Sequence, residues 1–457
     1  MSLSRQQTSD FLRALKTTPV DGSNDRMYVP LDAVRGDDGA ASTDVLWRSL
    51  VNTEEACVLF SGFPGSGKTT ELNRLRERLE RTVDPAVKKP DDDPYPTAVV
   101  FVDGEQFFDL YNPVGIADIL RVIAFRMDEE ANIIETGKPD PKKGFLPLFV
   151  AFLENTKVDF LGKIDFGQYL GGGVNLMLEI KNSPSFRDAA REAVARRGQA
   201  FLDLARASMT QSIERMRKAK KNKYLRVVVL VDGLDKIQPI QERDRDTIEK
   251  SIELLYVTQA SQLRIPCHVV YTFPLWLKYR FAMWNAYDAP PLVLPMVKVC
   301  DRHTQKDHED GIRALTDVLQ RRIDLDAVFG SASSESVRKL VRASGGYLRD
   351  LVRLVRDIVL MGKDFPVSAD FVDRTIARVK QEYVHTLLGT DLDVLAEVAT
   401  AREPPQDSGG KMAAFARLYE KRLILTYPSG DEWYDVHPII REEPRIQQRM
   451  MERNSKA

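Results

Sequence analysis

Five short apolar runs constrain the fold of this chain more than any other feature. They are rich in Val, Leu and Phe, and they stand at 56–62, 97–104, 226–233, 268–273 and 292–299. Nearly continuous apolar runs of this length are typical of strands buried on both faces, as in a parallel sheet covered by helices. Helical patterns such as "KTTELNRLRERLERTV" separate them. The alternation predicts an α/β fold built on a parallel sheet.

The interval between the second and third runs is too long for one crossover helix, so residues 105–222 are expected to hold an insertion. Most of it has helical patterns. The stretch "KIDFGQYLGGGVNLMLEIK" (163–181) alternates apolar and polar residues around three glycines, which suggests a β-hairpin. Two interpretations remain open, a packed helical insert or a protruding device that contacts a partner.

Beyond residue 305 the periodicity is helical only, and it predicts a small bundle. Two further helical patterns follow, and then "LILTYPSGDEWYDVHP" reads as two alternating strands around a turn. Helix, helix and hairpin in this order form the outline of a winged helix.

Composition excludes several classes of protein. The 457 residues carry a net charge of −1, so no overall basic excess points to nucleic acid or an anionic membrane. The N-terminus lacks the apolar core of a signal peptide, and no apolar run approaches the roughly 18 residues of a membrane helix. The three cysteines stand in or beside strand-like runs, which indicates buried thiols rather than disulfides or a metal site. We expect a cytoplasmic protein.

The stretch "GFPGSGKTT" fits the pattern G-x-x-x-x-G-K-[ST], and it lies between a predicted strand and a predicted helix. Glycines let backbone N–H groups surround a β-phosphate, Lys68 adds a charge for the β- and γ-phosphates, and Thr69 offers a hydroxyl to Mg²⁺. The alternative is a glycine-rich turn with an exposed lysine. The predicted nucleotide-binding residues are Gly62, Pro64, Gly65, Ser66, Gly67, Lys68, Thr69 and Thr70.

Asp232 ends the third run, at the edge of the sheet where ligands bind in open α/β folds. A carboxylate at that edge can hold Mg²⁺ through its water shell. The sequence therefore predicts Thr69 and Asp232 as the metal-binding residues, and ATP and Mg²⁺ as the cofactors.

Together with "VVVLVDGLDK", "VVYTF", "SGGYLRDLVRL" and the terminal "LILTYPSGDEWYDVHPII", these motifs resemble a bacterial P-loop ATPase of the AAA+/STAND branch with an initiator-type layout. The resemblance covers roughly residues 50 to 445, the insertion excepted. It implies an N-terminal segment packing on the core (1–50), a P-loop ATPase core (51–304), a helical lid (305–387) and a winged helix (388–457). A Gly-x-Pro signature of STAND proteins is missing, which favours the AAA+ side.

The resemblance also implies two sensors of the γ-phosphate. Thr272 ends the fourth run, where such proteins carry a polar sensor, although a buried strand-end threonine without this duty is an open alternative. Arg349 opens a lid helix, where they carry a second sensor arginine. The alternative for Arg349 is a surface arginine paired with Asp350 or Asp357.

The hydrolytic residue is the least certain part of the resemblance. AAA+ proteins carry a glutamate directly after the Walker B aspartate, but here Gly233 follows Asp232. STAND relatives use a pattern similar to "DGLDE", of which this chain keeps Asp235 and replaces the last acid with Lys236. Asp235 is thus the candidate to orient the attacking water, and slow hydrolysis is expected.

AAA+ sites are usually completed by an arginine of the next subunit, and Arg280 stands roughly where such a residue is expected. The alternative is an exposed arginine beside packed aromatic side chains. The hypothesis for function is a nucleotide-controlled regulatory or defence-type switch that signals to a partner protein. A homo-oligomer is a further expectation. The alternative is a DNA-engaging ATPase, which the acidic Asp431 and Glu432 of the expected wing tip disfavour.

Overall fold

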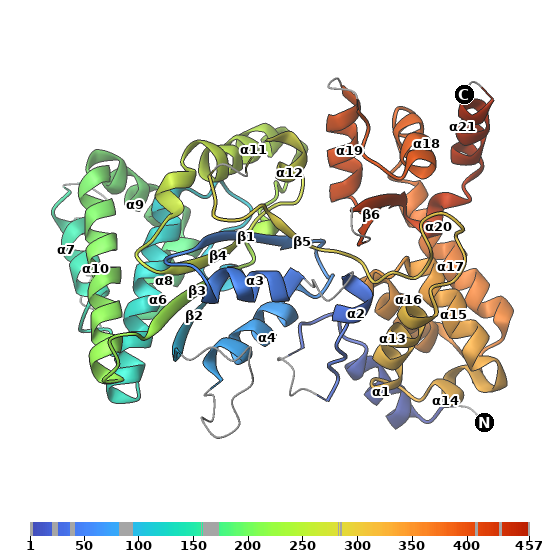
Figure 1. Cartoon of the computed structure of the whole chain (residues 1–457), viewed down its shortest axis with the longest axis horizontal. Coiled ribbons are helices and arrows are strands. Elements are labelled where there is room, and N and C mark those ends of the chain that lie inside the picture. The colour runs from blue at the N-terminus through green and yellow to red at the C-terminus, as the bar shows by residue number, and fades with distance from the viewer. Residues whose placement is uncertain are drawn as a thin grey trace.

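A parallel sheet forms the centre of the larger half of the molecule (Figure 1). The computed structural model describes residues 3–20, 26–36, 42–81, 95–156, 158, 173–281, 283, 286–406, 410–428 and 432–455. The five strands run in the order β2-β3-β4-β1-β5. They are β1 (Cys57–Gly62), β2 (Thr97–Asp103), β3 (Arg226–Asp232), β4 (His268–Thr272) and β5 (Leu292–Leu294). Each strand falls inside one of the five apolar runs, so the predicted parallel sheet covered by helices is confirmed.

Both faces of the sheet are buried because successive side chains of a strand point to opposite sides. In β1, Val58 and Phe60 pack into one apolar core with α4 (Lys68–Glu80) and α3 (Ser42–Val51). Cys57 and Leu59 pack into the other with α6 (Ile116–Thr136) and α10 (Gly198–Ala219). Two covered faces explain why the strands are apolar throughout rather than alternating.

The described part of the insertion is helical and shares its core with the sheet. Its helices are α5 (Gly104–Phe107), α6, α7 (Phe145–Glu154), α8 (Gly173–Asn182), α9 (Pro184–Arg196) and α10. The β-hairpin predicted at 163–181 is wrong over 173–181, and residues 163–172 lie outside the described residues. Leu176, Met177 and Ile180 have helical spacing and all three are buried, so one helical face decides the conformation.

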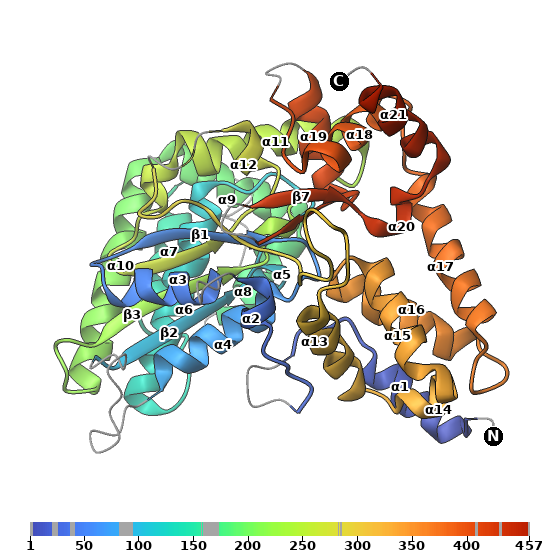
Figure 2. The same cartoon turned by 45° about the vertical axis from the view of Figure 1, so that its right-hand side comes forward.

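The connections within the core and the parts that follow it are helical apart from one hairpin (Figure 2). α11 (Arg245–Glu253) and α12 (Leu277–Arg280) flank β4. Short 3-10 helices span Leu234–Lys236, Glu242–Asp244, Ala260–Leu263 and Gly330–Ala332, and a π-helix spans Leu254–Thr258. The region predicted as a lid holds α13 (Glu309–Gln320), α14 (Leu325–Phe329), α15 (Ser333–Ser344), α16 (Leu348–Met361) and α17 (Ala369–Val384).

The C-terminal region holds α18 (Asp391–Ala401), α19 (Gly410–Glu420), the strands β6 (Ile424–Tyr427) and β7 (Trp433–Val436), α20 (Pro438–Arg441) and α21 (Pro444–Asn454). β6 and β7 pair antiparallel with Ile424 opposite Val436, as the hairpin pattern predicts. In Figure 2 this hairpin lies between the sheet and the lid helices.

The N-terminal segment, predicted to pack on the core, contacts two parts of the molecule. α3 does pack on the sheet, but α1 (Arg5–Ala14) lies against α16 of the lid. Leu15, Leu31 and Val34 are buried in one apolar core with the lid and the C-terminal region. The start of the chain, the lid and the C-terminal region are therefore held together by the same packing.

Among the described residues, no helix is both long enough and apolar enough to cross a membrane.

Candidate nucleotide-binding site

The loop between β1 and α4 has the shape that its glycines predict. Gly65 and Gly67 have φ values of 91° and 103°, a left-handed conformation that other residues rarely adopt. The Ser66 N–H donates to the carbonyl oxygen of Phe63 at 2.9 Å, which closes the turn before α4 begins at Lys68. The loop is therefore a tight turn leading into a helix N-terminus, the arrangement that binds phosphate groups.

Lys68 is not the exposed lysine of the alternative interpretation. Its side chain is 4% exposed, and Nζ donates to the carbonyl oxygens of Gly62 at 2.7 Å and Phe63 at 3.0 Å. Nζ also lies 2.8 Å from Oδ2 of Asp235, whose side chain is 2% exposed. The ammonium group is thus folded over the loop and neutralised by a buried acid.

Thr69 and Asp232 meet across the sheet edge. The Thr69 hydroxyl donates to Oδ2 of Asp232 at 2.6 Å, while Oδ1 of Asp232 is buried without a hydrogen-bond partner. Burial and the neighbouring Asp235 carboxylate raise the pKa of Asp232. A hydroxyl beside a carboxylate with an unpaired oxygen fits Mg²⁺, which prefers oxygen ligands. Among the described residues, no group of three or more His, Cys, Asp or Glu side chains could hold a metal ion.

The hydroxyl of Thr272, at the end of β4, is hydrogen-bonded to backbone groups of the protein. It donates to the carbonyl oxygen of Val231 at 3.2 Å and accepts from the Leu234 N–H at 3.0 Å. These bonds fix the turn that follows Asp232. The side chain is fully buried, and it does not line the two cavities beside the loop. This bonding is that of the alternative interpretation, a buried strand-end threonine.

The two charged residues in the turn after Asp232 have different partners. Gly233 has a φ of 86°, and the 3-10 helix Leu234–Lys236 follows. Asp235 faces Lys68, whereas Lys236 forms an ion pair with Glu105, at the start of α5. Burial lowers the pKa of Lys236, but the bond with Glu105 and nearby acids outweigh it and raise the pKa overall.

Arg349 lies on the loop between β1 and α4. A Cβ atom added at Gly65 would overlap the Arg349 guanidinium, and this guanidinium comes from the first turn of α16. The acids considered as its surface partners are engaged elsewhere. Asp350 lies 3.3 Å from Nε2 of His437, and Asp357 pairs with Arg378 at 3.3 Å.

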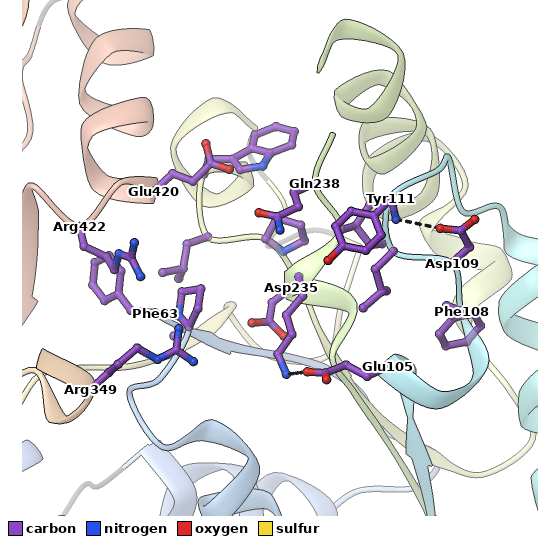
Figure 3. A pocket seen from close by; sticks show the side chains of 18 of the residues that line it. Phe63, Glu105, Phe108, Asp109, Tyr111, Asp235, Gln238, Arg349, Glu420 and Arg422 are labelled. Carbon is purple, nitrogen blue, oxygen red and sulfur yellow. Dashed lines mark hydrogen bonds and ion pairs between the residues drawn. The ribbon is translucent and has the colours of Figure 1, made fainter. Parts of the chain in front are cut away.

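Two cavities meet at this loop. One, of about 310 Å³, is enclosed by the loop, the N-terminal segment and the lid; its walls include Thr18, Tyr28, Leu31, Val318, Leu348 and Val352. The other, of about 520 Å³, lies toward the C-terminal region and is shown in Figure 3 with Phe63, Asp235 and Arg422 in its wall. Glu105, Lys236 and Arg349 line both cavities, so they stand at the junction.

Sequence reasoning missed three members of this site. Arg35 is buried and donates to the carbonyl oxygen of Ser66 at 2.6 Å, and burial lowers its pKa. The Tyr347 hydroxyl donates to the carbonyl oxygen of Pro64. Glu105 reaches the junction of the cavities. Arg35 lies in no recognisable motif, and Tyr347 lies in "SGGYLRDLVRL", where only Arg349 drew attention. Glu105 directly follows the second apolar run and could have been found from that position.

Arg280 lies away from both cavities. Its guanidinium pairs with Glu249 and stacks over the ring of Trp276 at 4.8 Å. This arrangement corresponds to the alternative that treated Arg280 as packed beside aromatic residues. A role of Arg280 in the site of a neighbouring subunit stays a prediction.

No known family model and no curated protein matches the chain. Among solved structures it is similar to a Walker-type ATPase of Pyrococcus abyssi, at 12% identity and a TM-score of 0.42 over 93% of this chain and 98% of that one. It is also similar to the ORC2 protein of Aeropyrum pernix, at 12% identity and 0.38 over 97% and 98%. A Drosophila ORC structure bound to DNA gives 13% and 0.35 over 98% and 94%. Similarity this distant assigns no residue a role.

Proposed function

We propose that the protein binds ATP with Mg²⁺ at the loop and hydrolyses it slowly. The observation that carries the proposal is the group formed by Lys68, Thr69 and Asp232, in which a buried ammonium, a hydroxyl and a carboxylate with a free oxygen converge at the start of α4. An ammonium and a helix N-terminus suit phosphate oxygens, and the hydroxyl–carboxylate pair suits the metal that accompanies them.

The base of the nucleotide fits the smaller cavity. Its wall is largely apolar where the N-terminal segment meets the lid, and Tyr28, Leu31 and Val352 line the cavity there. The loop forms the opposite wall. A nucleotide whose phosphates lie on the loop therefore has room for its base and ribose between the N-terminal segment and the lid.

The chain's own residues support a slow phosphoryl transfer. Bound Mg²⁺ would neutralise charge on the β- and γ-phosphates. Arg349, which reaches the loop from the lid, can stabilise charge that develops on the γ-phosphate. Slow turnover is expected because Gly233 occupies the position next to Asp232 and has no side chain to polarise water.

Lys68→Ala tests the binding part of the proposal. Loss of the ammonium should abolish most of the affinity for Mg-ATP, measured by equilibrium binding of labelled ATP to the folded protein. Lys250→Ala, which removes an exposed lysine of α11, is the matched control and should leave binding unchanged. Phosphate release should also stop when magnesium is removed by EDTA. Unchanged ATP affinity in folded Lys68→Ala protein contradicts the proposal.

The proposed role of hydrolysis is a switch. The start of α16 contacts both the loop and the C-terminal region, because Arg349 lies on Gly65 while Asp350 bonds His437. The carbonyl oxygen of Gly345 also accepts from the Tyr427 hydroxyl of β6 at 2.8 Å. A change at the γ-phosphate that moves Arg349 would therefore move the hairpin. We propose that this movement signals to a separate partner protein.

Hydrogen exchange tests the switch. The amides of residues 424–427 and 433–436 should exchange faster or slower with a non-hydrolysable ATP analogue than with ADP, and Arg349→Ala should remove the difference. Equal exchange in both nucleotides would contradict a switch without touching the ATPase proposal. A gel shift with duplex DNA tests the alternative, a DNA-engaging ATPase. In that case the hairpin would have to break the ion pair between Glu432 and Lys278.

A further inference from the structure

Hydrolysis, as proposed above, requires a group that takes the proton of the attacking water, and the two expected places do not offer a free one. Gly233 is left-handed at φ 86°, so a glutamate there would be strained. Asp235 is buried against Lys68 at 2.8 Å. Both of its carboxylate oxygens are buried, so an attacking water has little access to them.

The neighbouring strand brings another carboxylate to the same edge of the sheet. β2 pairs parallel with β3 in a register that sets Asp103 opposite Asp232. Gly104 follows, and a Cβ there would overlap the carbonyl oxygen of Asp232, so the two chain segments touch. Glu105 is the next residue, and it therefore starts directly beside the turn that follows Asp232.

The backbone of Glu105 is fixed by polar contacts on both sides. Its N–H donates to Oδ1 of Asp103 at 2.9 Å, which caps α5. Its carbonyl oxygen accepts from Nζ of Lys181, a residue of α8 in the insertion. The insertion thus has a direct role in holding this part of the site.

The side chain of Glu105 is 57% exposed and lines both cavities, with Lys236 and Arg349 as the other shared residues. Figure 3 shows its carboxylate on the same side of the cavity as Asp235, joined by a dashed line to an ammonium group. That ammonium belongs to Lys236, the residue that replaces the last acid of the "DGLDE"-like pattern. Lys236 thus stands in place of that acid, and Glu105, which follows the neighbouring strand β2, pairs with Lys236.

We propose that Glu105 is the general base of ATP hydrolysis and that Lys236 holds its carboxylate at the junction of the cavities. The water oxygen forms a bond to the γ-phosphorus, and the bond from that phosphorus to the bridging oxygen breaks. The bridging oxygen leaves with the electron pair on ADP. Glu105 takes one proton of the water and then releases it to solvent, so the products are ADP, inorganic phosphate and a proton.

Glu105→Gln keeps the shape of the side chain and removes its basicity. Steady-state phosphate release should fall by about 10²-fold or more, as for a lost general base, while the affinity for Mg-ATP stays at the wild-type value. Nucleotide extracted from the incubated variant should be ATP rather than ADP. Glu382→Gln is the matched control, because Glu382 is also half exposed and paired with a cation, Arg353, in the lid.

A double variant separates a base from a mere ion-pair partner. If Glu105 only holds Lys236 in place, Lys236→Gln alone should cost as much as Glu105→Gln, and adding Glu105→Gln to it should cost nothing more. As a base, Glu105 should still lose about 10²-fold when it is changed in the Lys236→Gln background.

The outcomes that overturn the assignment differ from those that overturn the proposed function. Wild-type protein that hydrolyses ATP while Glu105→Gln stays within about threefold of it removes Glu105 from the chemistry and leaves the ATPase intact. The same holds if Asp235→Asn, and not Glu105→Gln, loses turnover with ATP still bound. Wild-type protein that binds no ATP removes both proposals.

Discussion

The start of α16 and the helix α12 each carry an arginine expected to serve the γ-phosphate, but they are used differently. Arg349 of α16 lies on the loop between β1 and α4, against Gly65. Arg280 of α12 is paired with Glu249 and stacked on Trp276. One of the two arginines thus lies against Gly65, and the other is held by contacts within the same chain.

The two segments share a neighbour, the C-terminal region. It contacts both segments, through His437 at α16 and through Glu432 at α12, where both carboxylate oxygens accept from Lys278 at 2.6–2.7 Å. α12 also packs on α19. The same region thus supports the lid arginine and covers α12, so a movement of the hairpin would alter both at once.

Among the substitutions that test this comparison, Arg349→Ala in α16 should have the largest effect on turnover. Removing a donor that stabilises developing charge typically costs 10² to 10³ in turnover, and we expect a loss of about that size with a smaller loss of ATP affinity. The measurement is phosphate release at saturating Mg-ATP. Arg353→Ala, one turn further along α16, is the control and should change turnover less than about twofold. Equal losses in the two variants would mean that Arg349 acts only through folding.

Asp350→Asn should weaken the link between α16 and the C-terminal region. Asp350 is buried, accepts from the Tyr383 hydroxyl and lies 3.3 Å from Nε2 of His437, so its loss should lower the free energy of unfolding by about 1–3 kcal/mol. Although burial raises the pKa of Asp350, its bonds to His437 and Tyr383 outweigh that effect and the pKa is lowered overall.

A lowered pKa fixes the sign of the pH dependence. The stability that Asp350 contributes is present above its unfolded pKa of about 3.9 and is lost as the pH falls through the folded value. The difference in the free energy of unfolding between wild type and Asp350→Asn, measured in urea, should therefore shrink as the pH falls below about 4. A difference that grows on acidification would contradict this account.

The sequence predicted those parts of the molecule in which local pattern and global role coincide. The strands were found because two covered faces require apolar residues throughout, and the loop was found because its left-handed positions require Gly65 and Gly67. The hairpin predicted at 163–181 failed over 173–181 because period-two and helical spacing are hard to separate in a short apolar segment, and burial of Leu176 and Ile180 decided for a helix.

Long-range contacts left no comparable signal. Arg35 stands 31 residues before the carbonyl oxygen that it bonds, and no motif marks it. Glu105 reaches the site only because the register of β2 and β3 brings Gly104 against Asp232. Sequence alone could place each strand but not the order β2-β3-β4-β1-β5, and that order decides which strand ends are neighbours.

The smallest effects should come from α12, and they test whether its arginine ever serves a neighbour. Lys278→Ala removes an ion pair with Glu432 that is partly exposed, so it should cost at most about 1 kcal/mol of stability while loosening the cover on α12. If α12 then faces a second copy, ATP should raise the oligomeric mass at lower protein concentration than in wild type. Turnover per subunit should rise with concentration, and Arg280→Ala should bind ATP but remove that rise. Light scattering and phosphate release over a range of protein concentrations measure both. A chain that stays monomeric, with turnover independent of concentration in the Lys278→Ala variant, would leave Arg280 with its partners Glu249 and Trp276 and no catalytic part.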